Sequence, residues 1–95
     1  MAVNDTVSNC ESVANAAYLT IQPSGTTEWV IHNIDFGGAV EISRFDGTNE
    51  IIFRTESAIG EYACVRHVTN SDYLRVKNIS GGTIKIGYDG VVTKA

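Results

Sequence analysis

The sequence lacks the features that mark several classes of protein. Its 95 residues contain no long apolar run, whereas a membrane helix needs about 18–20 such residues in a row. Residues 1–5 have neither a basic segment nor an apolar stretch, so we expect no signal peptide. Acidic residues outnumber basic ones, eleven to seven, for a net charge of −4. Because nucleic-acid binders usually carry a basic excess, we expect neither a membrane nor a nucleic acid as partner.

Cysteine and histidine are also scarce. Cys10 and Cys64 can form at most one bridge, which excludes a disulfide scaffold, and without an export signal free thiols are favoured. The sequence alone leaves open whether the two pair. The two histidines, His32 and His67, do not stand at the tight spacing of a zinc site with either cysteine. We therefore expect no metal and no cofactor.

From Tyr18 onward the chain is rich in β-branched and aromatic residues that are interrupted by Gly, Asn, Asp and Ser clusters. The segments recur roughly every 8–12 residues, with no helical period between them, which is typical of antiparallel sandwiches and small barrels. We predict an all-β fold for residues 18–95: a single antiparallel β-sandwich or small, jelly-roll-like barrel of about seven to eight strands. The predicted strands cover residues 18–22, 28–34, 40–45, 50–55, 62–69, 73–79, 83–88 and 91–93.

Alternation of apolar and polar residues predicts which side chains form the core. Five pairs of apolar residues two positions apart should point inward: Leu19 and Ile21, Val40 and Ile42, Ile51 and Phe53, Leu74 and Val76, and Ile84 and Ile86. The core of so short a chain is shallow, and its edge strands would gain from being covered by another copy or a partner. The pattern thus favours an oligomer or a component of a larger assembly.

Residues 1–17 differ from the rest. They contain acidic but no basic residues and no aromatic one, and the valines at positions 3, 7 and 13 only weakly suggest a strand. Chain ends of this kind are often frayed. The sequence leaves two interpretations: a weak strand, or an N-terminal arm that becomes ordered on a partner.

No candidate catalytic group has a convincing neighbour, and we assign no catalytic, cofactor-binding or metal-binding residue. The rings of His32 and His67 are expected to be half-buried on a sheet. Cys64 lies three positions before His67, so in a strand the two side chains should point to opposite faces. Four acidic residues are expected at turns, and the sequence leaves open whether two of them converge on one end of the sandwich: Asp46, Glu50, Asp72 and Asp89.

The remaining candidates are surface groups. Arg75 and Lys77 should share a face, and Lys85 should join them across a hairpin at residues 80–82. This is either a solvated face balanced by Glu41, Glu50 or Glu61, or a docking face for an acidic partner. Exposed aromatic residues are often used to bind proteins or sugars, and the candidates are Trp29, Phe36, Tyr62, Tyr73 and Tyr88.

Several segments resemble small virion proteins of tailed bacteriophages: residues 29–34, 40–47, 67–78, 80–82 and 88–94. The resemblance covers roughly residues 28–94 and carries no functional residue. It implies a non-enzymatic structural protein on the outer surface of the virion head, made in the host cytoplasm. Such a capsid decoration (cement) protein would bridge subunits of the major capsid protein, or bind another virion protein, as a homo-oligomer such as a trimer. The alternative is a glycan- or host-surface-binding module of a phage fibre or adhesin.

Overall fold

The computed structural model describes residues 2–95, which form eight strands. Every paired strand is antiparallel, as the sequence predicts. Within residues 2–95 no helix is present that could cross a membrane. The strands are β1 (Thr6–Val13), β2 (Tyr18–Ile21), β3 (Glu28–Phe36), β4 (Val40–Phe45), β5 (Glu50–Glu56), β6 (Gly60–Val68), β7 (Tyr73–Asn78) and β8 (Ile84–Lys94).

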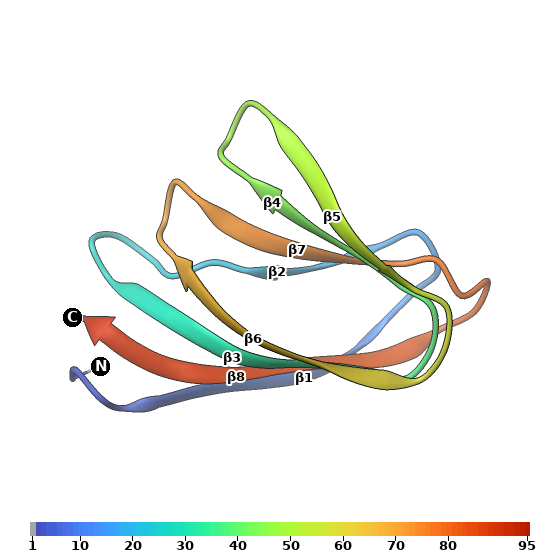
Figure 1. Cartoon of the computed structure of the whole chain (residues 1–95), viewed down its shortest axis with the longest axis horizontal. Coiled ribbons are helices and arrows are strands. Elements are labelled where there is room, and N and C mark those ends of the chain that lie inside the picture. The colour runs from blue at the N-terminus through green and yellow to red at the C-terminus, as the bar shows by residue number, and fades with distance from the viewer. Residues whose placement is uncertain (1) are drawn as a thin grey trace.

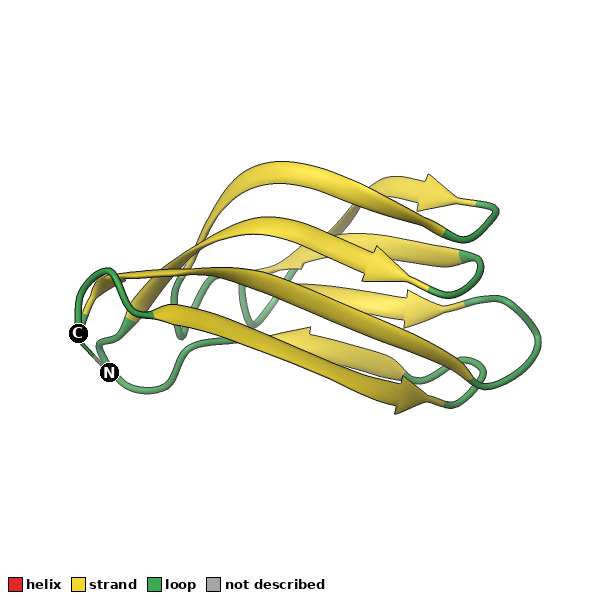
Figure 2. Cartoon of the chain, turned by 90° about the horizontal axis from the view of Figure 1, so that it is seen from below, coloured by secondary structure: helices red, strands yellow, loops and turns green. Residues whose placement is uncertain are grey.

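Two four-stranded sheets form a β-sandwich, with strand orders β1-β8-β3-β6 and β2-β7-β4-β5. The layers are seen in Figure 1, and Figure 2 shows strands joined only by loops. Of the connections between successive strands, only β4–β5 is a hairpin within one sheet; the others pass from sheet to sheet. This is the strand order of a jelly roll, in which two Greek keys wrap around one core.

The core lies between the sheets and is aliphatic. Most of the predicted inward pairs are buried, among them Leu19 with Ile21 and Leu74 with Val76. Full burial of one such side chain contributes about 1.5–3 kcal/mol. The exceptions are Ile84, which is partly buried, and the pair on β5, where Ile51 is 63% exposed and Phe53 only partly buried. These two are less covered because β5 is an edge strand that pairs with β4 alone.

Strand β8 is longer than predicted, because Asp89 and Gly90 continue it instead of forming a turn. Gly90 lies against the backbone of β3, beside the register shift between Ile31 and Asn33. A Cβ on Gly90 would overlap the carbonyl oxygen of Val30 and lie 2.9 Å from the Cα of Ile31. The glycine is therefore needed for close packing of two strands, which the sequence pattern does not distinguish from a turn.

The prediction of a hairpin at residues 80–82 is wrong. β7 lies between β2 and β4, whereas β8 lies between β1 and β3 in the other sheet. Lys85 is thus separated from Arg75 and Lys77, and the predicted basic cluster does not form. The buried Asn78 anchors this crossing: its Nδ2 donates to the carbonyls of Val13 (2.8 Å) and Gly82 (2.6 Å).

Residues 6–13 form strand β1, which pairs with β8 along its whole length. Val7 and Val13 are only 3% and 4% exposed. This part of the N-terminal segment therefore belongs to the same sandwich and core as the rest of the chain.

We predict that Gly90→Ala destabilises the protein by about 1–3 kcal/mol, because the added methyl group forces β3 and β8 apart. Urea denaturation measures the free energy of unfolding. Gly82→Ala is the matched control, since nothing lies within 4 Å of a Cβ at that position, and its effect should stay within about 1 kcal/mol. Equal effects of the two substitutions would contradict the close-packing role of Gly90.

Candidate functional site

The side of the sandwich between β5 and β6 carries the most exposed apolar surface. These strands are edges of opposite sheets, and Figure 1 shows β5 diverging from β6. Four of the seven large exposed hydrophobic residues described lie here: Ile51 (63% exposed), Ile52 (52%), Ile59 (78%) and Val65 (78%). We call these four side chains the β5–β6 patch. Ile52, opposite Ser43, lies on the outer face of its sheet and Val65 on the outer face of the other, so the four flank this side of the sandwich. Exposed aliphatic residues gathered on two edge strands and the loop between them mark a candidate binding surface.

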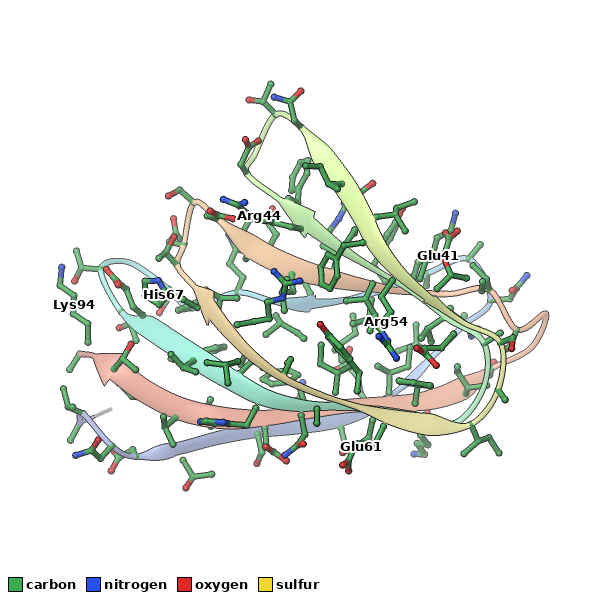
Figure 3. The ribbon with its side chains drawn as sticks, in the orientation of Figure 1. Glu41, Arg44, Arg54, Glu61, His67 and Lys94 are labelled. Atoms are coloured by element: carbon green, nitrogen blue, oxygen red, sulfur yellow. The ribbon has the colours of Figure 1, made fainter. Side chains whose placement is uncertain are left out.

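Across this side, two arginine–aromatic pairs connect the sheets. The Arg54 guanidinium on β5 lies 4.5 Å from the centre of the Tyr62 ring on β6. In return, the Arg66 guanidinium on β6 lies 4.0 Å from the centre of the Phe53 ring on β5. The two ring centres are 6.2 Å apart, and Figure 3 shows Arg54 extending between the strands. Since β5 and β6 do not pair through their backbones, these side chains provide contacts between them.

Both arginines point toward the core side of their sheets. Arg54 is in register with the buried Ile42, and Arg66 with the buried Ile31, and residues opposite each other share a face. Inward-pointing charges on edge strands are a known protection against edge-to-edge aggregation. Regular alternation along β5 predicts Ile51 and Phe53, not Arg54, on the inner side, but the register of β5 with β4 shifts between Ile42 and Ser43 and turns Arg54 inward.

Near one end of this side is a cleft of about 280 Å³. Arg44 makes a two-pronged ion pair with Asp72 in its wall, with N–O distances of 2.7 and 2.5 Å. This contact lowers the pKa of Asp72 and raises the pKa of Arg44. Arg66, in contrast, forms no ion pair with a carboxylate in residues 2–95. The lining residues are Arg44, Val65, Arg66, His67, Val68, Asp72, Tyr73 and Leu74.

The outer face of the β2-β7-β4-β5 sheet holds a separate, internally paired cluster. Arg75 donates to Glu50 Oε2 at 2.6 and 3.1 Å, and the buried Ser43 hydroxyl donates to the same oxygen at 2.7 Å. These bonds lower the pKa of Glu50. The expected balancing of Arg75 by Glu50 is confirmed. The same guanidinium covers the rings of Tyr18 (4.2 Å) and Phe45 (4.5 Å).

The two histidines lie on the surface, so the prediction of half-buried rings is wrong. His32 is exposed because the irregularity between Ile31 and Asn33 interrupts the alternation of β3. His67 Nε2 is 2.7 Å from a Glu28 carboxylate oxygen. Neither ring has a nucleophile or second histidine within a hydrogen bond among the described residues.

The cysteines form no disulfide with each other. Cys10 is exposed on β1, whereas Cys64 is partly buried and its thiol donates weakly to the Ile31 carbonyl at 3.5 Å. Burial raises the pKa of Cys64. The prediction that Cys64 and His67 diverge is confirmed, since Cys64 packs toward the core and His67 lies outside.

The four acidic residues considered from the sequence have different surroundings. Asp46 accepts bonds from the amides of Thr48 (3.0 Å) and Asn49 (2.7 Å) in the β4–β5 turn, which lowers its pKa. Glu50 and Asp72 pair with the arginines described above. Asp89 lies within β8, not at a turn, and accepts from Asn33 Nδ2 at 3.0 Å. In the part of the chain described, no three metal-ligating side chains gather.

The structure brings together two carboxyl groups that the sequence pattern did not predict to be neighbours. Asp35 on β3 and Glu61 on β6 stand directly opposite each other. Their hydrogen bond and mutual repulsion raise the pKa of Glu61, whose side chain points away from the sandwich in Figure 3. Only the strand register brings the two carboxyls together.

The aromatic residues mostly complete the core. Phe36, expected at the surface, is 4% exposed. Trp29 stacks on Tyr88 with ring centres 6.2 Å apart, and both pack against the core. Tyr73 meets Phe45 edge-on at 5.6 Å. These aromatic rings therefore pack mainly against the core and against one another.

The sequence matches no known family model, and no curated protein matches it.

We predict that the contact between Arg66 and Phe53 stabilises the fold. In a double-mutant cycle of Arg66→Met and Phe53→Leu, the coupling energy should be about 0.5–1 kcal/mol, the range for exposed cation–π pairs. Urea denaturation of the four proteins measures it. Arg66→Met combined with Phe45→Leu, whose ring lies on the outer face of one sheet, should be additive. Additivity in both cycles would show that the Arg66–Phe53 contact contributes nothing.

We also predict a dependence of stability on pH from Glu50. Because its folded-state pKa is lowered, its contribution is present above its ordinary pKa of about 4.3 and is lost as pH falls through the folded value. Glu50→Gln should therefore reduce the free energy of unfolding at pH 7 by up to about 1 kcal/mol, and the difference from the wild type should vanish in strong acid. Urea titrations from pH 7 to pH 2 measure both.

Glu41→Gln is the control for the change in net charge, because Glu41 forms no ion pair within residues 2–95. Its effect at pH 7 should be smaller than that of Glu50→Gln. If Glu50→Gln changed stability equally at pH 7 and pH 2, the pairing with Arg75 would not be the cause.

Proposed function

We propose that this chain is a non-enzymatic structural protein that attaches through its β5–β6 patch to a larger protein assembly, as a decoration protein of a phage capsid does. The supporting observation is that four exposed aliphatic side chains belong to the two edge strands β5 and β6 and to the loop that joins them. The jelly-roll architecture agrees with the proposal, because it is common among viral capsid proteins, although a fold by itself does not define a function.

The patch can supply a useful part of the binding free energy. Full burial of one Ile or Val side chain contributes about 1.5–3 kcal/mol. Association costs about 4–15 kcal/mol in lost freedom of motion. Burial of the four side chains in the patch offsets much of that loss, and a partner that also pairs with the free backbone edges adds hydrogen bonds. The patch therefore suits a protein surface of complementary shape.

Decoration would stabilise a shell by mass action. A protein that binds only the assembled form stabilises that form by about 2.7 kcal/mol per site when its free concentration is about 100 times Kd. No bond needs to be made or broken. Several copies around a symmetry axis of the shell, such as a trimer, would each contribute this amount.

The alternative of glycan binding has less support. A sugar would need exposed ring faces on which to stack. On the outer face of the β2-β7-β4-β5 sheet, the Arg75 guanidinium already lies over the rings of Tyr18 and Phe45. The aliphatic patch, by comparison, is the kind of surface that protein partners bury.

We predict that the protein sediments with assembled shells of the major capsid protein encoded in the same genome, and not with free capsid subunits. Ile52→Ser with Val65→Ser should weaken this attachment at least tenfold, because two apolar contacts are lost. Sedimentation over a concentration series gives Kd. A raised dissociation temperature of the decorated shells provides an independent readout.

The matched control is Val3→Ser with Ile79→Ser, which removes two exposed aliphatic side chains outside the patch. This variant should bind within about twofold of the wild type. Circular dichroism verifies that both variants keep the β fold. Wild-type protein that stays in the supernatant, or equal binding by the two variants, would refute attachment through the patch.

A further inference from the structure

The free edge of β6 lies beside the cleft that contains Arg66. β6 spans nine residues and pairs only with β3, so its other edge has no partner strand in the described chain. We propose that this edge binds an extended segment of a partner protein as an added β-strand, with a carboxylate of that segment facing Arg66. The inference rests on the proposed attachment function and specifies the partner's chemistry.

Strand addition requires an edge whose side chains alternate between two different surroundings. On β6, Cys64 and Arg66 lie on the core side, whereas Val65 and His67 lie outside. An added strand would place its own side chains alternately on the same two sides. Backbone hydrogen bonds would then provide affinity, and the side chains would select the sequence.

Arg66 determines the preference on the inner side. Its guanidinium rests on the Phe53 ring at 4.0 Å and has no carboxylate partner among residues 2–95. The neighbouring arginines are already paired, Arg44 with Asp72 and Arg54 with Glu56. One positive charge therefore remains unmatched on this side. A planar guanidinium held by an aromatic ring is well suited to bind a carboxylate with two parallel hydrogen bonds.

On the outer side, Val65 determines the preference. Val65 belongs to β6, and its side chain is 78% exposed on the outer face. An apolar residue of the added strand would therefore cover it. Farther along β6, the Asp35–Glu61 pair presents negative charge and would repel an acidic residue. The fitting segment thus carries its carboxylate at the Arg66 end of β6, next to apolar residues on the alternate side.

The test uses an acetylated and amidated octapeptide of alternating Thr and Val in which one inward Thr is replaced by Glu. Matched peptides carry Gln or Lys at that position. In ¹⁵N NMR titrations of the full chain, the Glu peptide should shift the amides of Tyr62–Val68 and slow their hydrogen exchange. We expect its Kd to be at least tenfold lower than those of the Gln and Lys peptides.

Arg66→Gln should abolish the preference for Glu over Gln, while Arg66→Lys should keep part of it. Lys85→Gln is the control for charge, because Lys85 is exposed on β8, away from the edge, and the preference should remain. The amide spectrum of each variant without peptide verifies that it is folded. The proposal is overturned if Arg66→Gln still prefers the Glu peptide over the Gln peptide. It is also overturned if the amide shifts are confined to β1, β2 or β5, or if the Glu peptide does not bind up to its solubility limit.

The two proposals fail separately. If the protein sediments with shells through the patch but the Glu peptide does not bind β6, the added strand is wrong and the attachment stands. If the peptide binds β6 with the expected preference but no shell is bound, the edge recognises an acidic segment and the attachment to a capsid is wrong.

Discussion

The two sheets of this sandwich cannot be joined by backbone hydrogen bonds along the side where β5 and β6 meet. Each of these strands pairs with one neighbour in its own sheet. Side chains must hold this side together, and two crossed arginine–aromatic contacts lie there, Arg54 on Tyr62 and Arg66 on Phe53. An arginine can cover an apolar ring and still keep its charge near water. This constraint explains why the inner residues of β5 and β6 are less buried than those of the central strands.

The lack of backbone pairing between β5 and β6 also determines where the candidate binding surface lies. Edge strands that are not covered by their own sheet leave aliphatic side chains and backbone groups exposed, and inward arginines limit indiscriminate pairing with other edges. Such charges also discriminate among partners, since a strand with a carboxylate relieves the unmatched guanidinium and a basic strand does not. Protection against aggregation and selective docking can thus arise from one set of residues.

Much of the fold was predictable because most strands have a local signal in the sequence, namely alternating apolar residues bounded by turn residues. The all-β class, the turn between β4 and β5 and inward pairs such as Leu74 and Val76 all follow from alternation and turn residues. The errors occur where long-range contacts overrule local pattern. Gly90 resembles a turn residue but serves a close approach of strands, and the glycines at 81 and 82 lie in a crossing between sheets. The candidate site could hardly be predicted from the sequence, because Phe53 lies on a different strand from Tyr62 and Arg66 and only the folded chain brings the three side chains together.

The amino-acid sequence by itself determined the all-β class, most of the strands, the aliphatic core and the acidic balance of the chain, because these depend on residue type and on neighbours one or two positions away. Tertiary structure alone decided which strands are edges, which arginines face inward and which carboxyls meet, as Asp35 and Glu61 do. The physical reason is that strand order and register set these contacts. They result from how eight strands share one core and leave no mark in any single segment.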